Sequence, residues 1–449
     1  RLVCASLLLL GILAVGSPIR AELAVTVYNS DLGVIREVRE LRFSKGAGRL
    51  AFRDVPSRID PTSVRFKTLN SQRKISILEQ NYQFDLVSQE KIYNSYIDSE
   101  IELISKDGKI YTGTLLAFSN FSITLKNRGG ELEIVRLDDI ANLRFPELPE
   151  GLITRPTLFW DYSSDQSGKT RCEVSYQTSG MSWTAEYVAT LNDSEERLDL
   201  SGWSSIDNRS GKTYKDATLK LVAGDIHRAT APVKLPRYST MARETGTDAG
   251  FREKAFFEYH LYTLPRASTI ANSEIKQLSL FEPAEAGVTK EYFYTASSES
   301  KQVEVKLKFE NSVANGLGMP LPGGRVRIFK NDTDGSTILL GEDRISHTPR
   351  DEELLLTVGR AFDLVAEETT LDRRSLSPKV TEYDYKISLR NRKEESVTIH
   401  VLKSLGFDWT ITKTSQQFKK KSAQKVVFDM YVPAGEEVEL LFTVRYQRP

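Results

Sequence analysis

The side chains that most often perform catalysis or bind transition metals are few in this chain and far apart. Its four histidines are His227, His260, His347 and His400, and no two of them are close in sequence. Neither an HExxH nor an HxH pattern occurs, and there is no cysteine and histidine cluster of the kind that holds zinc. No GxSxG turn marks a serine nucleophile. We therefore predict no catalytic residues and no cofactor.

One acidic segment has the oxygen-rich composition of a calcium loop. Residues 331–336 read NDTDGS, which places Asp332 and Asp334 at alternate positions ahead of a glycine. However, Lys330 occupies the place of the first acidic ligand, and Gly341 stands where a bidentate glutamate belongs. We interpret the segment as a hairpin turn. Asp332 and Asp334 remain the only metal candidates.

The four tryptophans are the other side chains with a possible binding role. Trp160, Trp183, Trp203 and Trp409 could form a surface that stacks against sugar rings. Each of them lies within a segment of strand-like alternation, where a tryptophan is more often part of the core. We therefore keep the glycan surface as an alternative to core packing.

Strand patterns dominate the elements that must position these residues. Segments of alternating polar and apolar residues, such as VIREVRELRF (34–43), occupy most of the region between 23 and 78. Comparable patterns recur between 157 and 222 and again from 256 to the end of the chain. This alternation indicates sheets with one solvated face. The expected fold class is therefore all-β, with several antiparallel, immunoglobulin-like sandwiches.

A compact unit is expected to interrupt the first set of strands. A short helix is expected near 84–96, and short strands separated by turns follow between 97 and 145. This spacing suits a small, strongly bent β-barrel, and the unit resembles Sm-like or SH3-like barrels. Such barrels can bind RNA, but the charges here are mixed rather than clustered. We interpret the unit as an inserted spacer and predict no nucleic-acid partner.

The first residues and the cysteines indicate the compartment. Residues 1–21 combine basic residues with an apolar run and small residues, which is typical of a secretory signal peptide; whether it is cleaved or lipid-modified at Cys4 stays open. The run is too short to span a bilayer, so no transmembrane segment is expected after its removal. Only Cys172 then remains, which excludes an intramolecular disulfide framework. With 61 basic and 61 acidic residues in the whole chain, a dedicated polyanion binder is not expected.

Several motifs carry a family resemblance. They are YTLP (262–265), NSE (272–274), KQLSLF (276–281), GMPLPGG (318–324), LGED (340–343), GRAFD (359–363) and, earlier, SWTAEY (182–187). Together they resemble the mucoidy inhibitor A-like family, whose characteristic domain has no assigned function. The resemblance implies a bacterial, exported, all-β protein of the periplasm or cell envelope. It supplies no catalytic or binding residue.

These observations predict a chain of several units. The expected order is a signal peptide (1–21), an N-terminal sandwich (22–80 plus 147–228), the inserted helix and small barrel (84–146), a flexible linker (229–252), a sandwich of the family domain (253–360) and an immunoglobulin-like sandwich (361–449). The leading hypothesis is a non-catalytic envelope module that recognises a protein or a polysaccharide. The alternatives are an envelope hydrolase acting on a peptide or glycan, and a purely structural spacer. The oligomeric state is not predicted.

Overall fold

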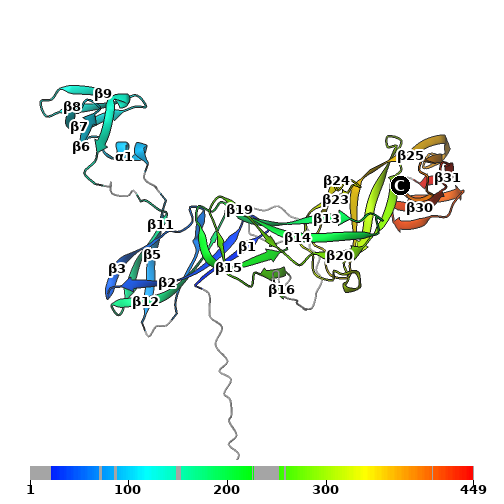
Figure 1. Ribbon diagram of the computed structural model, residues 1–449, viewed down its shortest axis with the longest axis horizontal. Helices are drawn as coiled ribbons and strands as arrows, with labels where there is room; N and C mark the ends of the chain where they lie inside the picture. The colour runs from blue at the N-terminus through cyan, green and yellow to red at the C-terminus, as the bar shows by residue number, and fades with distance from the viewer. Residues whose placement is uncertain are drawn as a thin grey trace, which may run out of the picture.

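The fold was analysed in a computed structural model, which describes residues 22–447 apart from 70–72, 85–87, 148–152, 225, 227–251, 257–258 and 407. The expected signal peptide and nearly all of the expected linker therefore lie outside the described residues. As predicted, the protein is built almost entirely of strands, arranged in five sheets (Figure 1). No helix in the described part of the chain is long and apolar enough to cross a membrane.

The N-terminal half contributes two sheets. The larger contains, in spatial order, β16 (Arg252–Phe256), β17 (Tyr259–Thr263), β15 (Tyr214–Ala223), β1 (Leu23–Tyr28), β2 (Gly33–Phe43), β12 (Gly168–Thr178) and β4 (Ile59–Thr68), with β18 (Ser268–Ile270) also paired to β15. A three-stranded sheet contains β3 (Gly46–Arg53), β11 (Thr157–Ser164) and β5 (Ile75–Gln83). Both sheets include strands from before and after the inserted unit. Neither sheet can therefore be completed until the chain has passed through that unit.

The inserted unit is a curved five-stranded sheet preceded by a short helix. The helix α1 (Gln89–Ser95) begins at Ser88, whose hydroxyl accepts a hydrogen bond from the Lys91 amide. The strand order is β10 (Ile140–Arg144), β6 (Glu100–Ser105), β7 (Ile110–Phe118), β8 (Ser122–Asn127) and β9 (Leu132–Arg136). One 3₁₀ turn, η1 (Leu137–Asp139), carries the chain from one edge strand to the other. The expected barrel is therefore not closed: the described residues form no ladder between β9 and β10.

A central sheet joins segments from both sides of the expected linker. Its order is β19 (Glu274–Ser279), β14 (Arg197–Asn208), β13 (Met181–Leu191), β23 (Gly324–Asn331) and β24 (Thr337–Ile345), with β20 (Ala284–Gly287) also paired to β14. β13 and β23 run parallel, and the 3₁₀ turn η2 (Val313–Asn315) precedes β23. Strands that the sequence analysis placed in separate units thus share one sheet.

The C-terminal sheet has nine strands and curls until its edges meet. Its order is β28 (Asp408–Thr414), β31 (Glu437–Gln447), β26 (Val380–Asn391), β25 (Glu353–Ser377), β22 (Gln302–Glu310), β21 (Thr289–Thr295), β27 (Val397–Ser404), β30 (Lys425–Val432) and β29 (Lys419–Ser422). Trp409 on one edge donates its indole N–H to the Ala423 carbonyl beyond the other edge, at 2.7 Å. The curl buries a separate core that includes Tyr294, Ile399 and Phe428.

Parallel pairing is where the fold departs from the expected purely antiparallel sandwiches. β1 pairs in parallel with β15, β13 with β23, and β21 with β27. A parallel pair requires a crossover between the two strands, and here long stretches of intervening chain supply it. The sheets are therefore mixed, and none of them closes into a barrel.

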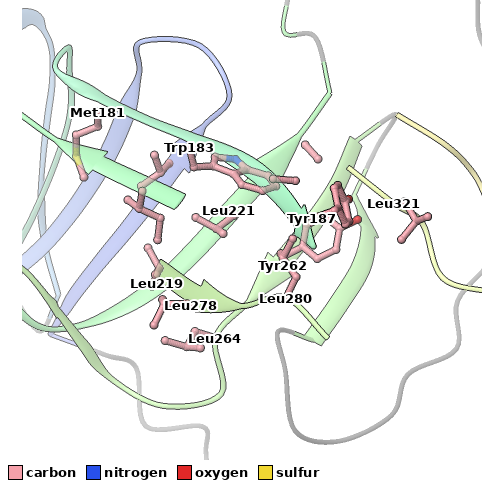
Figure 2. Close-up of a cluster of buried hydrophobic side chains, with 14 of the residues drawn as sticks. Met181, Trp183, Tyr187, Leu219, Leu221, Tyr262, Leu264, Leu278, Leu280 and Leu321 are labelled. Carbon is pink, nitrogen blue, oxygen red and sulfur yellow. The ribbon is translucent and has the colours of Figure 1, made fainter. Parts of the chain in front are cut away.

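The largest core holds the N-terminal and central sheets together. It extends from Val25 to Leu356 and includes Trp160, Trp183 and Tyr262 as fully or almost fully buried rings. Figure 2 shows Trp183 from β13 beside Leu221 from β15, with Leu278 and Leu280 below them. This common core fixes the orientation of β13 and β14, so the opposite face of the central sheet is available to solvent.

Candidate functional site

The calcium candidates lie in a hairpin between β23 and β24. The Asp332 amide donates to the Ser336 carbonyl at 2.8 Å, and the Gly335 amide donates to the Asp332 carbonyl at 2.9 Å. Gly335 has a φ of 86°, a conformation that glycine adopts without strain. The Asp334 carboxylate accepts a hydrogen bond from the Ser336 amide. The segment therefore has the hairpin geometry that the sequence analysis favoured over a calcium loop.

We expect calcium to leave the melting temperature of the protein unchanged. A ligand stabilises a protein only if it binds the folded state, and both aspartates already accept hydrogen bonds from the turn. The measurement is thermal unfolding with millimolar calcium and with a chelator. A calcium-dependent rise that disappears in Asp334→Asn would instead establish a site here.

The structure does not bring the three described histidines together. His400 lies on β27, where its Nδ1 is 2.8 Å from a carboxylate oxygen of Asp429. His347 accepts a hydrogen bond at Nδ1 from the Gly323 amide. His260 lies on β17, and His227 is outside the described residues. Across the described ranges, no three histidine, cysteine, aspartate or glutamate side chains are grouped so that they could hold a metal ion.

The tryptophans divide into buried and exposed residues. Trp160 and Trp183 have no exposed surface, as expected for core residues, and each donates its indole N–H to a partner within the protein. Trp409 is half-buried and bonded to Ala423. Trp203 differs, because 40% of its surface is exposed on the outer face of the central sheet. It is the tryptophan best placed to contact a ligand.

Strand register defines the surroundings of Trp203. Trp203 on β14 is paired directly with Glu186 on β13 and with Ser279 on β19. Ser205, two residues further along β14, is paired with Thr184 and Gln277. Side chains paired in this way are neighbours on one face of a sheet. We call this surface the tryptophan face; it consists of Thr184, Glu186, Trp203, Ser205, Gln277, Ser279 and Arg325.

Glu186 is held in place on the tryptophan face by two arginines. Its carboxylate accepts hydrogen bonds from Arg325 at 3.1 and 3.3 Å and from Arg327 at 3.2 Å. The Glu186 side chain is only 17% exposed, so these ion pairs are partly shielded from water. Arg327 also bonds Glu342 at 2.8 Å. The charges beside the indole are therefore fixed and nearly balanced, which suits a neutral polar ligand better than a polyanion.

The inner face beneath Trp203 is tightly packed. The neighbouring Gly202 lies against the Phe281 ring, so that a Cβ atom at this position would approach the ring to 2.2 Å. The Gly202 carbonyl also accepts a hydrogen bond from the Leu280 amide at 2.8 Å. These contacts hold the backbone of β14 in place next to Trp203. The Trp203 indole therefore projects from a rigid surface.

A buried ion pair lies on the side of the N-terminal sheet that faces away from solvent. Glu37 and Lys212 are 6% and 8% exposed, and their Oε1 and Nζ atoms are 2.7 Å apart. Tyr176 donates its hydroxyl to the same oxygen, and Arg39 donates to Oε2 at 2.8 Å. Burial opposes ionisation of Glu37, but the charges of Lys212 and Arg39 hold the pKa of its carboxyl below the ordinary value. These groups are satisfied and inaccessible, so we interpret the cluster as structural.

The architecture defines a multi-sheet, all-β protein with an aromatic and polar face on its central sheet. Comparison with known protein families shows which family the chain belongs to. Residues 172–449, more than half of the chain, match the family described as Domain of unknown function (DUF4139), and the chain belongs to this family. That region includes the central sheet's β13 and β14 and the whole C-terminal sheet. No curated protein matches the chain.

Proposed function

We propose that this chain is an exported cell-envelope protein, of the mucoidy inhibitor A-like kind, that binds a polysaccharide without modifying it. The export part rests on the signal-like composition of residues 1–21. The family part rests on the motifs described above together with the matched domain of unknown function. The binding part rests on the tryptophan face.

The observation that carries the binding proposal is the exposed indole of Trp203 within a polar sheet face. An indole presents a large apolar surface, against which the C–H groups of a sugar ring can stack. Gln277 and Thr184, both exposed, supply hydrogen-bonding groups on either side of Trp203. Trp203 lines neither of the two clefts found in the described residues, so an extended chain of sugars lying across the sheet fits this face better than an enclosed small molecule.

The same geometry explains why we prefer binding to hydrolysis. A glycosidase needs two carboxyl groups on opposite sides of the scissile bond, one of them able to remain protonated. On the tryptophan face the single carboxylate, Glu186, is engaged by Arg325 and Arg327. The face can therefore orient a sugar chain but does not supply an acid and base pair.

We expect Trp203→Ala to weaken binding of envelope polysaccharide by at least about tenfold, because loss of a central tryptophan commonly costs 2 kcal/mol or more of binding free energy. The measurement is co-sedimentation of residues 22–449 with purified, insoluble envelope polysaccharide. Tyr431→Ala is the matched control, since Tyr431 is an aromatic residue 63% exposed on β30, away from the face.

Three results would contradict the proposal. Equal binding by wild type and Trp203→Ala would exclude the tryptophan face. Failure of the wild type to co-sediment with the polysaccharide would exclude the polysaccharide as the ligand. Release of soluble sugar fragments during incubation would identify a hydrolase instead.

A further inference from the structure

A second candidate site lies where the central sheet meets the C-terminal sheet. It is a cleft of about 210 Å³ with an apolar floor formed by Leu191, Leu307, Leu340 and Val358. Phe362 stands at its rim and is 95% exposed. The volume is below the roughly 300 Å³ at which pockets for drug-sized ligands begin. The cleft therefore has room for about one amino-acid side chain.

The polar wall on the central-sheet side is Glu195, in the turn between β13 and β14. Its φ of 60° is held by Asn192, whose side-chain oxygen accepts hydrogen bonds from the amides of Glu196 and Arg197, both at 3.0 Å. The Glu195 carboxylate is paired with Lys290 from β21 and with Lys330 from β23, the latter at 2.7 Å. The two lysines lower the pKa of Glu195 to about 2, so it stays ionised at neutral pH.

The polar wall on the C-terminal-sheet side is Lys393, in the turn between β26 and β27. Its ammonium donates to the Tyr292 hydroxyl at 3.0 Å and to Glu395 at 3.3 Å. Tyr292 is only 6% exposed, whereas the Glu395 side chain is 62% exposed and faces water. Lys290 and Asp363 line the same cleft as Lys393, so a second lysine and an acidic side chain lie in its lining.

Both lysines of the cleft can still donate a hydrogen bond to a further acceptor. Lys290 shares its partner Glu195 with Lys330, and among the described residues Lys393 is paired with one carboxylate, that of Glu395, which is largely solvated. Each ammonium carries three donor hydrogens and can accept another oxygen ligand. Beside these charges the floor is entirely aliphatic. The two halves of the lining therefore call for a ligand that joins a carboxylate to an apolar side chain.

We propose that this cleft binds the α-carboxylate of an apolar amino-acid residue, with the carboxylate between Lys290 and Lys393 and the side chain on the Leu307 and Val358 floor. The carboxylate replaces solvent near the Tyr292 hydroxyl, and the Phe362 ring covers the side chain. Both a free amino acid and the carboxyl terminus of a peptide carry this chemistry. The site is separate from the tryptophan face and does not depend on the proposed function.

Titration of residues 22–449 with three probes tests the proposal, followed by isothermal calorimetry or by chemical shifts. N-acetyl-leucine has the carboxylate without the ammonium, leucinamide has the ammonium without the carboxylate, and leucine has both. We expect N-acetyl-leucine to bind and leucinamide to fail. Tighter binding of leucine than of N-acetyl-leucine identifies a free amino acid as the ligand, and the reverse order identifies a peptide terminus.

The variant Lys393→Met should weaken N-acetyl-leucine binding by at least about tenfold, since a hydrogen bond to a charged group is lost. Lys215→Met, at an exposed lysine on β15, is the matched control and should bind like wild type. Trp203→Ala should also bind like wild type, which separates this site from the tryptophan face. No saturable binding of any probe, equal binding of leucinamide, or an unchanged affinity in Lys393→Met would overturn the proposal.

Discussion

Replacing Trp183 with alanine is expected to lower the free energy of unfolding by about 3–5 kcal/mol, the range typical of a large aromatic side chain removed from a core. Trp183 has no exposed surface and packs edge-on to the Tyr262 ring, with their centroids 6.2 Å apart. Its indole N–H donates to the Val222 carbonyl at 2.9 Å, which ties β13 to β15. The substitution leaves both a cavity and an unsatisfied buried carbonyl.

Urea unfolding of wild type and variant measures this loss. The matched control is Trp203→Ala, which removes the same side chain from the next strand of the same sheet. Because Trp203 is 40% exposed, we expect this control to cost about 1 kcal/mol or less. Equal losses in the two variants would mean that Trp183 is not the core residue that Figure 2 shows.

Replacing Lys212 with methionine is expected to cost about 3 kcal/mol. Breaking a buried ion pair leaves the remaining charge uncompensated, which commonly costs about 3–5 kcal/mol. Glu37 keeps Arg39 as a partner, so we place the loss at the lower end of this range. Lys215→Met, three residues away and exposed, should have little effect. The double variant Glu37→Gln with Lys212→Met should lose less than the sum of the single variants.

The same pair predicts a pH dependence. The folded-state pKa of Glu37 lies below its ordinary value of 4.5, so the stabilisation that it contributes is complete above about that pH. It is lost as the pH falls through the folded-state pKa. The difference in unfolding free energy between wild type and Lys212→Met should therefore shrink on acidification below 4.5. A difference that stays constant down to the acid unfolding transition would show that Glu37 is not the partner responsible.

Alternation of residues was sufficient to predict the all-β fold class. Residues 34–43, whose alternation predicted a strand, lie within β2, and Ile35 is on its buried face. The pairing of strands was not predictable, because a strand carries little information about its distant neighbour. The parallel pairing of β13 with β23, about 140 residues later in the chain, is one such case. Whether the inserted sheet closes into a barrel depends on the curvature of all five strands together, which the sequence of a single strand does not determine.

The two candidate sites differ in how far they could be predicted from the sequence. The sequence did contain a signal for Trp203. Leu198, Leu200 and Ile206 are separated by even numbers of residues and therefore lie on one face of β14, which is the buried face. Trp203 is an odd number of residues from each of them, so it lies on the opposite, polar face. For the cleft there was no such signal. Glu195, Lys290 and Lys393 belong to three segments spread over about 200 residues, and only the meeting of two sheets brings them together.

The central claim is that Trp203 contacts a polysaccharide, and fluorine NMR of protein labelled with 5-fluorotryptophan tests it most directly. The four tryptophans give separate resonances that can be assigned by single substitution to phenylalanine. We predict that solubilised envelope polysaccharide shifts or broadens the Trp203 resonance, while the resonances of the buried Trp160 and Trp183 stay unchanged. A Trp203 resonance that does not respond at saturating polysaccharide, or a response confined to Trp409, would contradict the proposal.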